Sequence, residues 1–135
     1  MNLFVDSSAW EALYAANDKY HPAAANALRS LINTKTTFYT SDYIFDETIT
    51  LLLGRSSHQQ ANQCGDWLLS SARVRLIRIG VAQWYEAWQL FHQYDDKAFS
   101  FTDCTSFIVM RQFKLREAFT FDRHFEQMGF RLWPK

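Results

Sequence analysis

Four acidic residues stand where predicted strands end or predicted helices begin, and they are the residues best placed to do chemistry. They are Asp6, Glu47, Asp103 and Asp122. If their carboxylates meet in the fold, they repel one another unless cations lie among them. Hard oxygen ligands favour Mg²⁺ or Mn²⁺, and both ions bind phosphate groups readily. The pattern therefore predicts a site for one or two divalent ions, with phosphodiester hydrolysis as its chemistry.

The predicted elements bring these acids to one edge of a sheet. Short apolar runs precede Asp6 and Asp122, and each run predicts a buried strand. Glu47 and Asp103 lie near the starts of predicted helices. In an α/β sheet, functional groups collect beyond the carboxyl ends of the strands, where the connecting helices also begin. We therefore expect all four side chains on the same rim.

Each acid taken alone also has an ordinary structural explanation. Asp103 can interact with a helix dipole, and Asp6 or Asp122 can cap a helix or form a turn. Glu47 can be a solvated helical residue, and its neighbour Asp46 competes with it for a place in the site. Adjacent helical residues point about 100° apart, so only one of these two can face the site.

Strands and helices alternate along the chain. Predicted strands cover residues 3–5, 36–40, 74–79 and 117–121, with an edge strand at 130–133. Predicted helices begin after Asp6, at His21, at Ser41 or Asp42, at Ser56 or Ser57, at Val81 and at Thr102; the third ends at Gly54. This alternation indicates an α/β sandwich with a central, mainly parallel sheet of four or five strands flanked by helices. We expect residues 1–135 to form a single domain.

The clearest helical stripe in the sequence lies between residues 81 and 91. Its members recur at helical spacing and are Val81, Trp84, Tyr85, Trp88 and Phe91. Apolar periodicity of this kind is mainly a burial signal, so we expect the stripe to pack in the core. By the same helical reasoning, Cys104 turns toward the core although it adjoins Asp103.

Composition excludes several classes of protein. Formal net charge is zero, which argues against a generic basic nucleic-acid binder but allows a nuclease whose acidic site offsets basic residues elsewhere. The two cysteines form no paired motif, so free thiols in a reducing cytosol are expected. No leader-like segment and no membrane-spanning apolar run is present, and we predict a cytoplasmic protein. A Gly-rich phosphate loop is also missing.

Four motifs, in this order, resemble those of PIN-domain proteins, and most closely the small VapC-type toxins of bacterial toxin–antitoxin pairs. They are LFVDSS at 3–8, TSDYIFDET at 40–48, FTDCTSF at 101–107 and TFDRHF at 120–125. The resemblance implies a three-layer sandwich and a Mg²⁺- or Mn²⁺-dependent endoribonuclease. It assigns the acidic roles to Asp6, Glu47, Asp103 and Asp122, and it implies a hydroxyl near the metals, Ser7 foremost and Thr102 second.

Local basic residues must supply RNA contacts if the global charge is zero. The candidates are Arg111, Lys114, Arg116 and Arg123. Each is equally well explained as a solvated surface charge, which is the common role of Lys and Arg. His124 lies two residues from Asp122 and can approach a phosphate or a carboxylate, although a local packing or surface role is the one expected for it.

The resemblance also implies partners: an RNA substrate, a small antitoxin protein and a second copy in a homodimer. Side chains of the first helices would supply the groove, although ordinary core packing explains most of them; they are Trp10, Leu13, Tyr14, Leu51 and Leu53. Two alternatives stay open. The protein can be a catalytically silent PIN-like interaction module, or a PIN nuclease with a housekeeping role in RNA processing.

Overall fold

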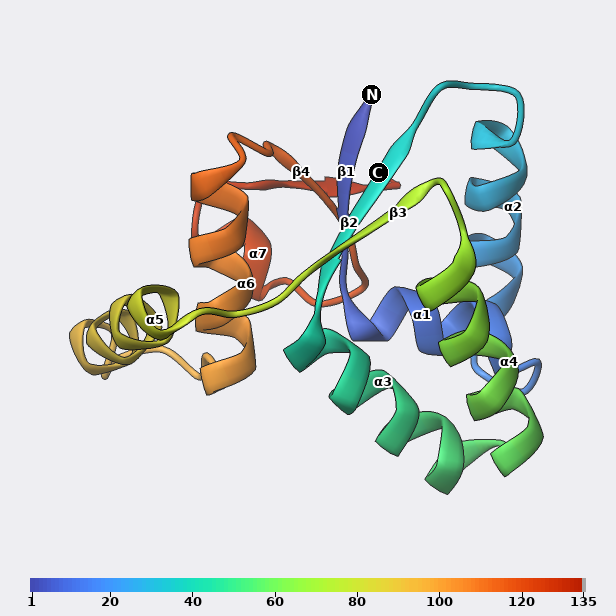
Figure 1. The fold of residues 1–135 in the computed structure, drawn as a ribbon, viewed down its shortest axis with the longest axis horizontal. Helices are drawn as coiled ribbons and strands as arrows, with labels where there is room; N and C mark the ends of the chain where they lie inside the picture. Colours follow the sequence, from blue (N-terminus) through green and yellow to red (C-terminus); the bar gives the residue numbers. More distant parts are fainter. Residues whose placement is uncertain (135) are drawn as a thin grey trace.

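A computed structural model describes residues 1–134 and shows a five-stranded sheet in which every strand pairing is parallel (Figure 1). The strand order is β3-β2-β1-β4-β5. The strands are β1 (Asn2–Val5), β2 (Thr37–Ser41), β3 (Val74–Ile77), β4 (Glu117–Phe119) and β5 (Arg131–Trp133). The predicted parallel sheet is confirmed, including its short edge strand.

Helices cover both sides of the sheet, which gives the predicted three layers. The described residues form α1 (Ser7–Tyr14), α2 (His21–Leu31), α3 (Asp42–Arg55), α4 (His58–Ser70), α5 (Val81–Gln93), α6 (Phe101–Gln112) and α7 (His124–Gln127). In Figure 1, α1, α2 and α4 lie on one side of the strands and α6 and α7 on the other. None of these helices is long and apolar enough to cross a membrane.

Strand β1 is the centre of the molecule. Its residues Leu3, Phe4 and Val5 are completely buried, because β2 and β4 pair with β1 on either side and helices cover both faces. A run with no polar residue is what a strand buried on both faces requires. Asp6 follows immediately, so the first of the four acids lies at the carboxyl end of the central strand.

Serine side chains cap the N-termini of three helices. The Oγ atoms of Ser41 and Ser57 accept backbone N–H groups at the starts of α3 and α4. Helix α6 begins at Phe101 and is capped by Ser100, whose Oγ accepts the N–H of Asp103 at 3.0 Å. The prediction that Thr102 caps this helix was therefore wrong, since Thr102 lies inside its first turn.

Two predicted ends shift by a few residues because local hydrogen bonds decide them. Helix α3 continues past Gly54 to Arg55, since the N–H of Ser56 still bonds the carbonyl of Leu52 at 2.9 Å. Strand β4 ends at Phe119: the N–H of Thr120 still donates to the carbonyl of Trp133 in β5 at 3.3 Å, but that of Phe121 leaves the sheet and donates to Ser8 Oγ at 3.0 Å. Asp122 thus lies on a short loop beyond the strand.

The end of β3 is also decided by a hydrogen bond to a residue distant in sequence. Strand β3 ends at Ile77, and the N–H of Ile79 donates to the Asp42 carboxylate at 3.1 Å.

Gly65 lies inside α4, where a Cβ would meet Phe45 and Ile49 of α3 at 3.3 Å. The glycine, unfavourable for an isolated helix, lets α3 and α4 approach closely.

Helix α5 corrects the strongest burial prediction from the sequence. Its aromatic stripe is exposed: Val81, Trp84, Tyr85, Trp88 and Phe91 all keep more than a third of their surface accessible. The buried side of α5 consists of Ala87 and Leu90, which face α6. Figure 1 shows why: α5 lies outside α6 at one end of the molecule, so only its narrow inner side has a protein partner.

Candidate active site at the carboxyl edge of the sheet

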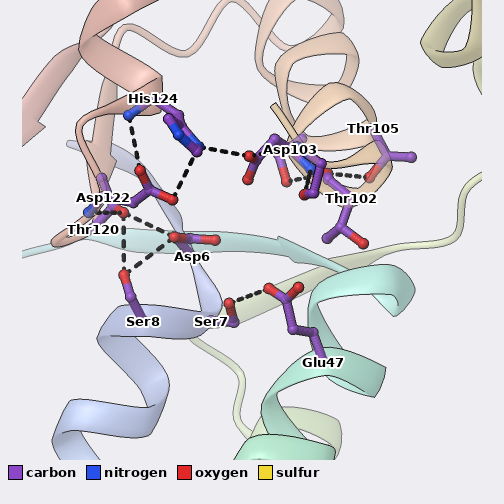
Figure 2. A network of polar contacts seen from close by, with 12 residues as sticks. Asp6, Ser7, Ser8, Glu47, Thr102, Asp103, Thr105, Thr120, Asp122 and His124 are labelled. Atoms are coloured by element: carbon purple, nitrogen blue, oxygen red, sulfur yellow. Dashed lines mark hydrogen bonds and ion pairs between the residues drawn. The ribbon is translucent and has the colours of Figure 1, made fainter. Parts of the chain in front are cut away.

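The four predicted acids converge on one cavity of about 730 Å³, which Asp6, Glu47, Asp103 and Asp122 all line. They come from four elements: the end of β1, the second turn of α3, the first turn of α6 and the loop after β4. Figure 2 shows their carboxylates pointing toward a common space. The parallel topology explains the convergence, because every one of these segments lies at the carboxyl edge.

Asp6 is the most deeply placed of the four, with only 4% of its surface exposed. Its Oδ2 accepts hydrogen bonds from Thr120 Oγ1 at 2.8 Å and Ser8 Oγ at 3.1 Å. Burial raises the pKa of Asp6 to about 7, the charges of Asp103 and Glu47 act in the same direction, and the Thr120 hydrogen bond opposes them. An ionised Asp6 therefore calls for a cation nearby.

Asp103 is fixed from two sides. Its Oδ2 accepts the N–H of Ser100 at 3.0 Å, which completes the reciprocal cap at the start of α6. The same oxygen lies 2.8 Å from Nδ1 of His124. His124 Nδ1 is also 3.3 Å from Oδ2 of Asp122, so the imidazole stands between two carboxylates.

Asp122 is oriented by its own loop. Its Oδ1 accepts the N–H of His124 at 2.9 Å, and its backbone N–H donates to Thr120 Oγ1 at 3.0 Å. Asp103, Asp122 and His124 each offer one possible ligand atom, and these three atoms all lie within 4.8 Å of one another. Two carboxylates and an imidazole, with buried Asp6 beside them, are a donor set that fits a divalent ion such as Mn²⁺ or Mg²⁺.

The structure separates Glu47 from its neighbour. Glu47 accepts a hydrogen bond from Ser7 Oγ and lines the cavity, whereas Asp46 is exposed on α3. Thr102, the second hydroxyl candidate, does not line the cavity; its carbonyl oxygen accepts a hydrogen bond from Thr105 Oγ1 at 2.6 Å. Ser7 is thus the predicted hydroxyl that meets an acid.

The predicted basic residues are only partly gathered at the site. Arg123 lines the cavity and pairs with Glu126 at 2.6 Å. Arg111, Lys114 and Arg116 are exposed at or beyond the far end of α6, roughly 12 Å or more along the helix from Asp103. Two cations that the sequence did not single out, Lys19 and Arg55, line the cavity instead.

Sequence reasoning missed several polar side chains at this site. Ser8 and Thr120 hold Asp6, and His124, besides packing against Phe99 as expected, joins two carboxylates, the alternative that the sequence had left second. Their closeness to Asp6 and Asp122 in sequence was the available signal. No sequence signal marked Glu11, a buried acid on the cavity wall whose pKa is raised to about 7, chiefly by burial and then by Asp18.

Both cysteines are free and buried. Cys104 points into the core, as expected, and burial raises its pKa to about 11. The same effect raises the pKa of Cys64 to about 12. Neither thiol is in a form suited to act as a nucleophile at neutral pH.

A parallel sheet with acids gathered at its carboxyl edge defines the class, and the sequence model of the PIN domain matches residues 3–131. The chain belongs to the PIN-domain family. It is 34% identical over 128 residues to VapC20 of Mycobacterium tuberculosis, a 23S rRNA-specific endonuclease, in two strains. The alignment covers 95% of each chain.

Solved structures agree with this assignment. The crystal structure of Mycobacterium tuberculosis VapC20, a toxin that cleaves the sarcin–ricin loop, superposes with a TM-score of 0.87 at 33% identity and 95% coverage of both chains. VapBC2 of Rickettsia felis, solved with a promoter DNA fragment, gives a TM-score of 0.69 at 13% identity. The second likeness shows the shared fold.

Proposed function

We propose that this protein is a metal-dependent endoribonuclease and the toxin of a type II toxin–antitoxin pair. The observation that carries the proposal is the convergence of Asp6, Glu47, Asp103 and Asp122 on one cavity. Four carboxylates gathered in this way, one of them buried, repel one another unless a cation is bound. RNA is the favoured substrate because VapC20, 34% identical over nearly the whole chain, cleaves ribosomal RNA.

The chain's own residues have separate tasks in this proposal. The four acids hold the ion, and His124 adds a nitrogen ligand. When bound, a divalent ion supplies Lewis-acid activation of water and neutralises charge on the phosphate. Thr120 and Ser8 hold the Asp6 carboxylate in place, and Ser7 does the same for Glu47.

Cations at the cavity wall receive the RNA backbone. Lys19, Arg55 and Arg123 line the cavity and are exposed, so their charges are accessible to phosphates. The position of these cations explains how a chain with zero net charge can bind RNA: positive charge is needed only beside the acidic centre. Arg111, Lys114 and Arg116 remain candidates only for distant parts of a long substrate.

Cleavage of ribosomal RNA by the purified protein, with Mg²⁺, with Mn²⁺ and with a chelator, tests the proposal. We expect metal-dependent cleavage that falls by about 100-fold or more in Asp6→Asn and in Asp103→Asn, because each removes a charged ligand. Asp46→Asn is the matched control, since it neutralises an exposed acid next to Glu47 and should cleave like the wild type. No cleavage by the wild type, together with no metal binding by calorimetry, would overturn the nuclease assignment and favour the silent interaction module.

We also propose a small antitoxin as a partner, and an apolar cavity on the first helices supports this. Trp10, Leu13, Tyr14, Leu28 and Trp67 line an apolar cavity of about 200 Å³ between α1, α2 and α4. A cavity of this kind accepts an apolar side chain of a partner. Co-expression with the product of a neighbouring small reading frame tests it: Leu13→Glu should abolish co-purification, whereas Leu53→Glu, at an exposed leucine outside this cavity, should not. If neither pairing nor growth inhibition is seen, a housekeeping nuclease is the better reading.

The expected homodimer also remains a proposal, and we place it on α5 instead of on the first helices. Trp10 is buried and Leu51 lines the acidic cavity, so neither is free for a second copy. Helix α5 carries five large apolar side chains that each keep more than a third of their surface exposed, and exposed apolar surface of this kind marks protein contacts. Light scattering should give a dimer for the wild type and a monomer for Trp88→Glu.

A further inference from the structure

An aromatic pair lies at the wall of the acidic cavity. The rings of Tyr20 and Phe121 are stacked, with centroids 4.5 Å apart and planes within 5° of parallel. Both residues line the same cavity as Asp6 and Asp122. Tyr20 keeps 39% of its surface exposed, whereas Phe121 is half-buried and packs against the core, so Tyr20 is the ring that is open to solvent.

Both rings are held in fixed positions relative to the acids. The N–H of Tyr20 donates to Asp18 Oδ1 at 2.8 Å, just before α2 begins. The N–H of Phe121 donates to Ser8 Oγ, and that same hydroxyl donates to the Asp6 carboxylate. Phe121 is also the residue directly before Asp122. The aromatic pair and the acidic centre are therefore parts of one connected framework.

Two cationic side chains, those of Lys19 and Arg123, line the same cavity as Tyr20 and Phe121. Lys19 Nζ lies 4.9 Å from the centroid of the Tyr20 ring, and Arg123 lies on the other side of Asp122 in sequence from Phe121. A flexible, exposed lysine can leave the ring and reach a phosphate when a ligand arrives. Exposed aromatic rings flanked by cations are the combination with which proteins bind unpaired nucleotides, the rings stacking on bases and the cations contacting phosphates.

We infer that the Tyr20–Phe121 pair is a stacking platform for one unpaired base of the RNA substrate, next to the phosphodiester that is cut, with Lys19 on an adjacent phosphate. This inference rests on the proposed ribonuclease function and deepens it. A base inside a duplex already has both faces covered by its neighbours, so the platform selects single-stranded or loop RNA over a continuous helix. Since every base has an aromatic face, the platform favours unpaired structure without selecting a base.

Binding of short RNA oligonucleotides in the Asp103→Asn background, where cleavage is blocked, tests the platform. Each oligonucleotide carries one fluorescent purine analogue, whose emission is quenched when it stacks on an aromatic ring. We expect quenching at one position with the platform intact, and binding weakened by about 5- to 100-fold with loss of quenching in Tyr20→Leu. Tyr20→Phe should retain both, because it keeps the ring.

Controls separate stacking from a structural role. Tyr85→Leu removes an exposed tyrosine of α5 outside the cavity, and its binding and quenching should match the parent. Duplex RNA should bind equally with or without the Tyr20 ring. If the role of Tyr20 is only structural, Tyr20→Leu should lower the melting temperature while the quenching persists. That result would overturn the platform.

The remaining outcomes distinguish this inference from the proposed function. Cleavage by the wild type with unchanged RNA binding and quenching in Tyr20→Leu would overturn the platform and leave the nuclease intact. No cleavage by the wild type, but quenching that depends on Tyr20, would overturn the nuclease and support the platform as an RNA-binding site. Absence of any RNA binding would overturn both.

Discussion

Nδ1 of His124 lies 2.8 Å from Oδ2 of Asp103, although 21 residues separate them in sequence. The same nitrogen is 3.3 Å from Asp122. A nitrogen held between two carboxylates has the position of a third ligand to a divalent ion. The segment after β4 therefore brings two side chains with candidate ligand atoms, Asp122 and His124, to the cavity, where the sequence suggested one.

His124→Ala is expected to change which metal the protein prefers. Both ions favour oxygen ligands, but Mn²⁺, a transition-metal ion, accepts an imidazole nitrogen more readily than the harder Mg²⁺ does. We therefore expect Mn²⁺ affinity to fall by about tenfold and Mg²⁺ affinity to change little. Calorimetric titration with each ion measures both values, and His92→Ala, an exposed histidine of α5, is the control. Equal losses for the two ions would argue against nitrogen ligation.

Thr120→Val is expected to disturb two acids through one hydroxyl. Thr120 Oγ1 donates to Asp6 and accepts the N–H of Asp122, so it links the two carboxylate positions. Loss of such an outer contact typically lowers metal affinity by about 10- to 100-fold. Thr120→Ser keeps the hydroxyl and should stay near the wild type in metal titration and RNA cleavage. Wild-type metal binding by Thr120→Val would contradict this role.

Glu11 is expected to make stability fall as pH rises. Burial raises its pKa to about 7 from 4.5, and the hydrogen bond and charge of Asp18 add to this while Arg55 opposes. Between these values the folded state binds more protons than the unfolded state, so stability from protonated Glu11 is lost as pH increases. The pKa of Asp18 is lowered by its hydrogen bond with Glu11, so Asp18 is ionised in both states there.

Comparison with Glu11→Gln isolates this effect from the other titrating groups. From about pH 4.5 to about pH 7, the free energy of unfolding of the wild type should fall relative to the variant, by on the order of 1 kcal/mol. Urea unfolding at a series of pH values measures the difference. A difference that does not change with pH would show that Glu11 has an ordinary pKa.

Thr48→Val is expected to stabilise the protein. Thr48 lies fully buried in α3, and its Oγ1 is a buried side-chain atom without a hydrogen-bond partner in the described residues 1–134. Valine has nearly the same shape and removes the cost of burying the hydroxyl, so unfolding should require about 1 kcal/mol more. Thermal unfolding measures this, while RNA cleavage should be unchanged. A lower melting temperature would mean that the hydroxyl is satisfied in solution.

Local sequence signals predicted the strands and helices better than they predicted what packs against each of them. Residues 3–5 contain no polar side chain, and that property alone marks a strand buried on both faces. The stripe at Trp84 and Trp88 has equally strong periodicity, yet both side chains stay about 40% exposed, since Phe101 of α6 covers them only in part. Periodicity shows that a helix has an apolar side; it does not show that the fold supplies a layer to cover that side.

The alternation of strands and helices can be predicted from the residues alone. With it comes the edge at which Asp6, Glu47, Asp103 and Asp122 meet, because parallel strands all end on the same side. Tertiary structure decided which neighbours complete the site. The choice of Glu47 over Asp46, the contact of Thr120 with Asp6 and that of His124 with Asp103 depend on hydrogen bonds between segments up to 114 residues apart. Such contacts follow from how the layers pack, and local propensity carries no information about them.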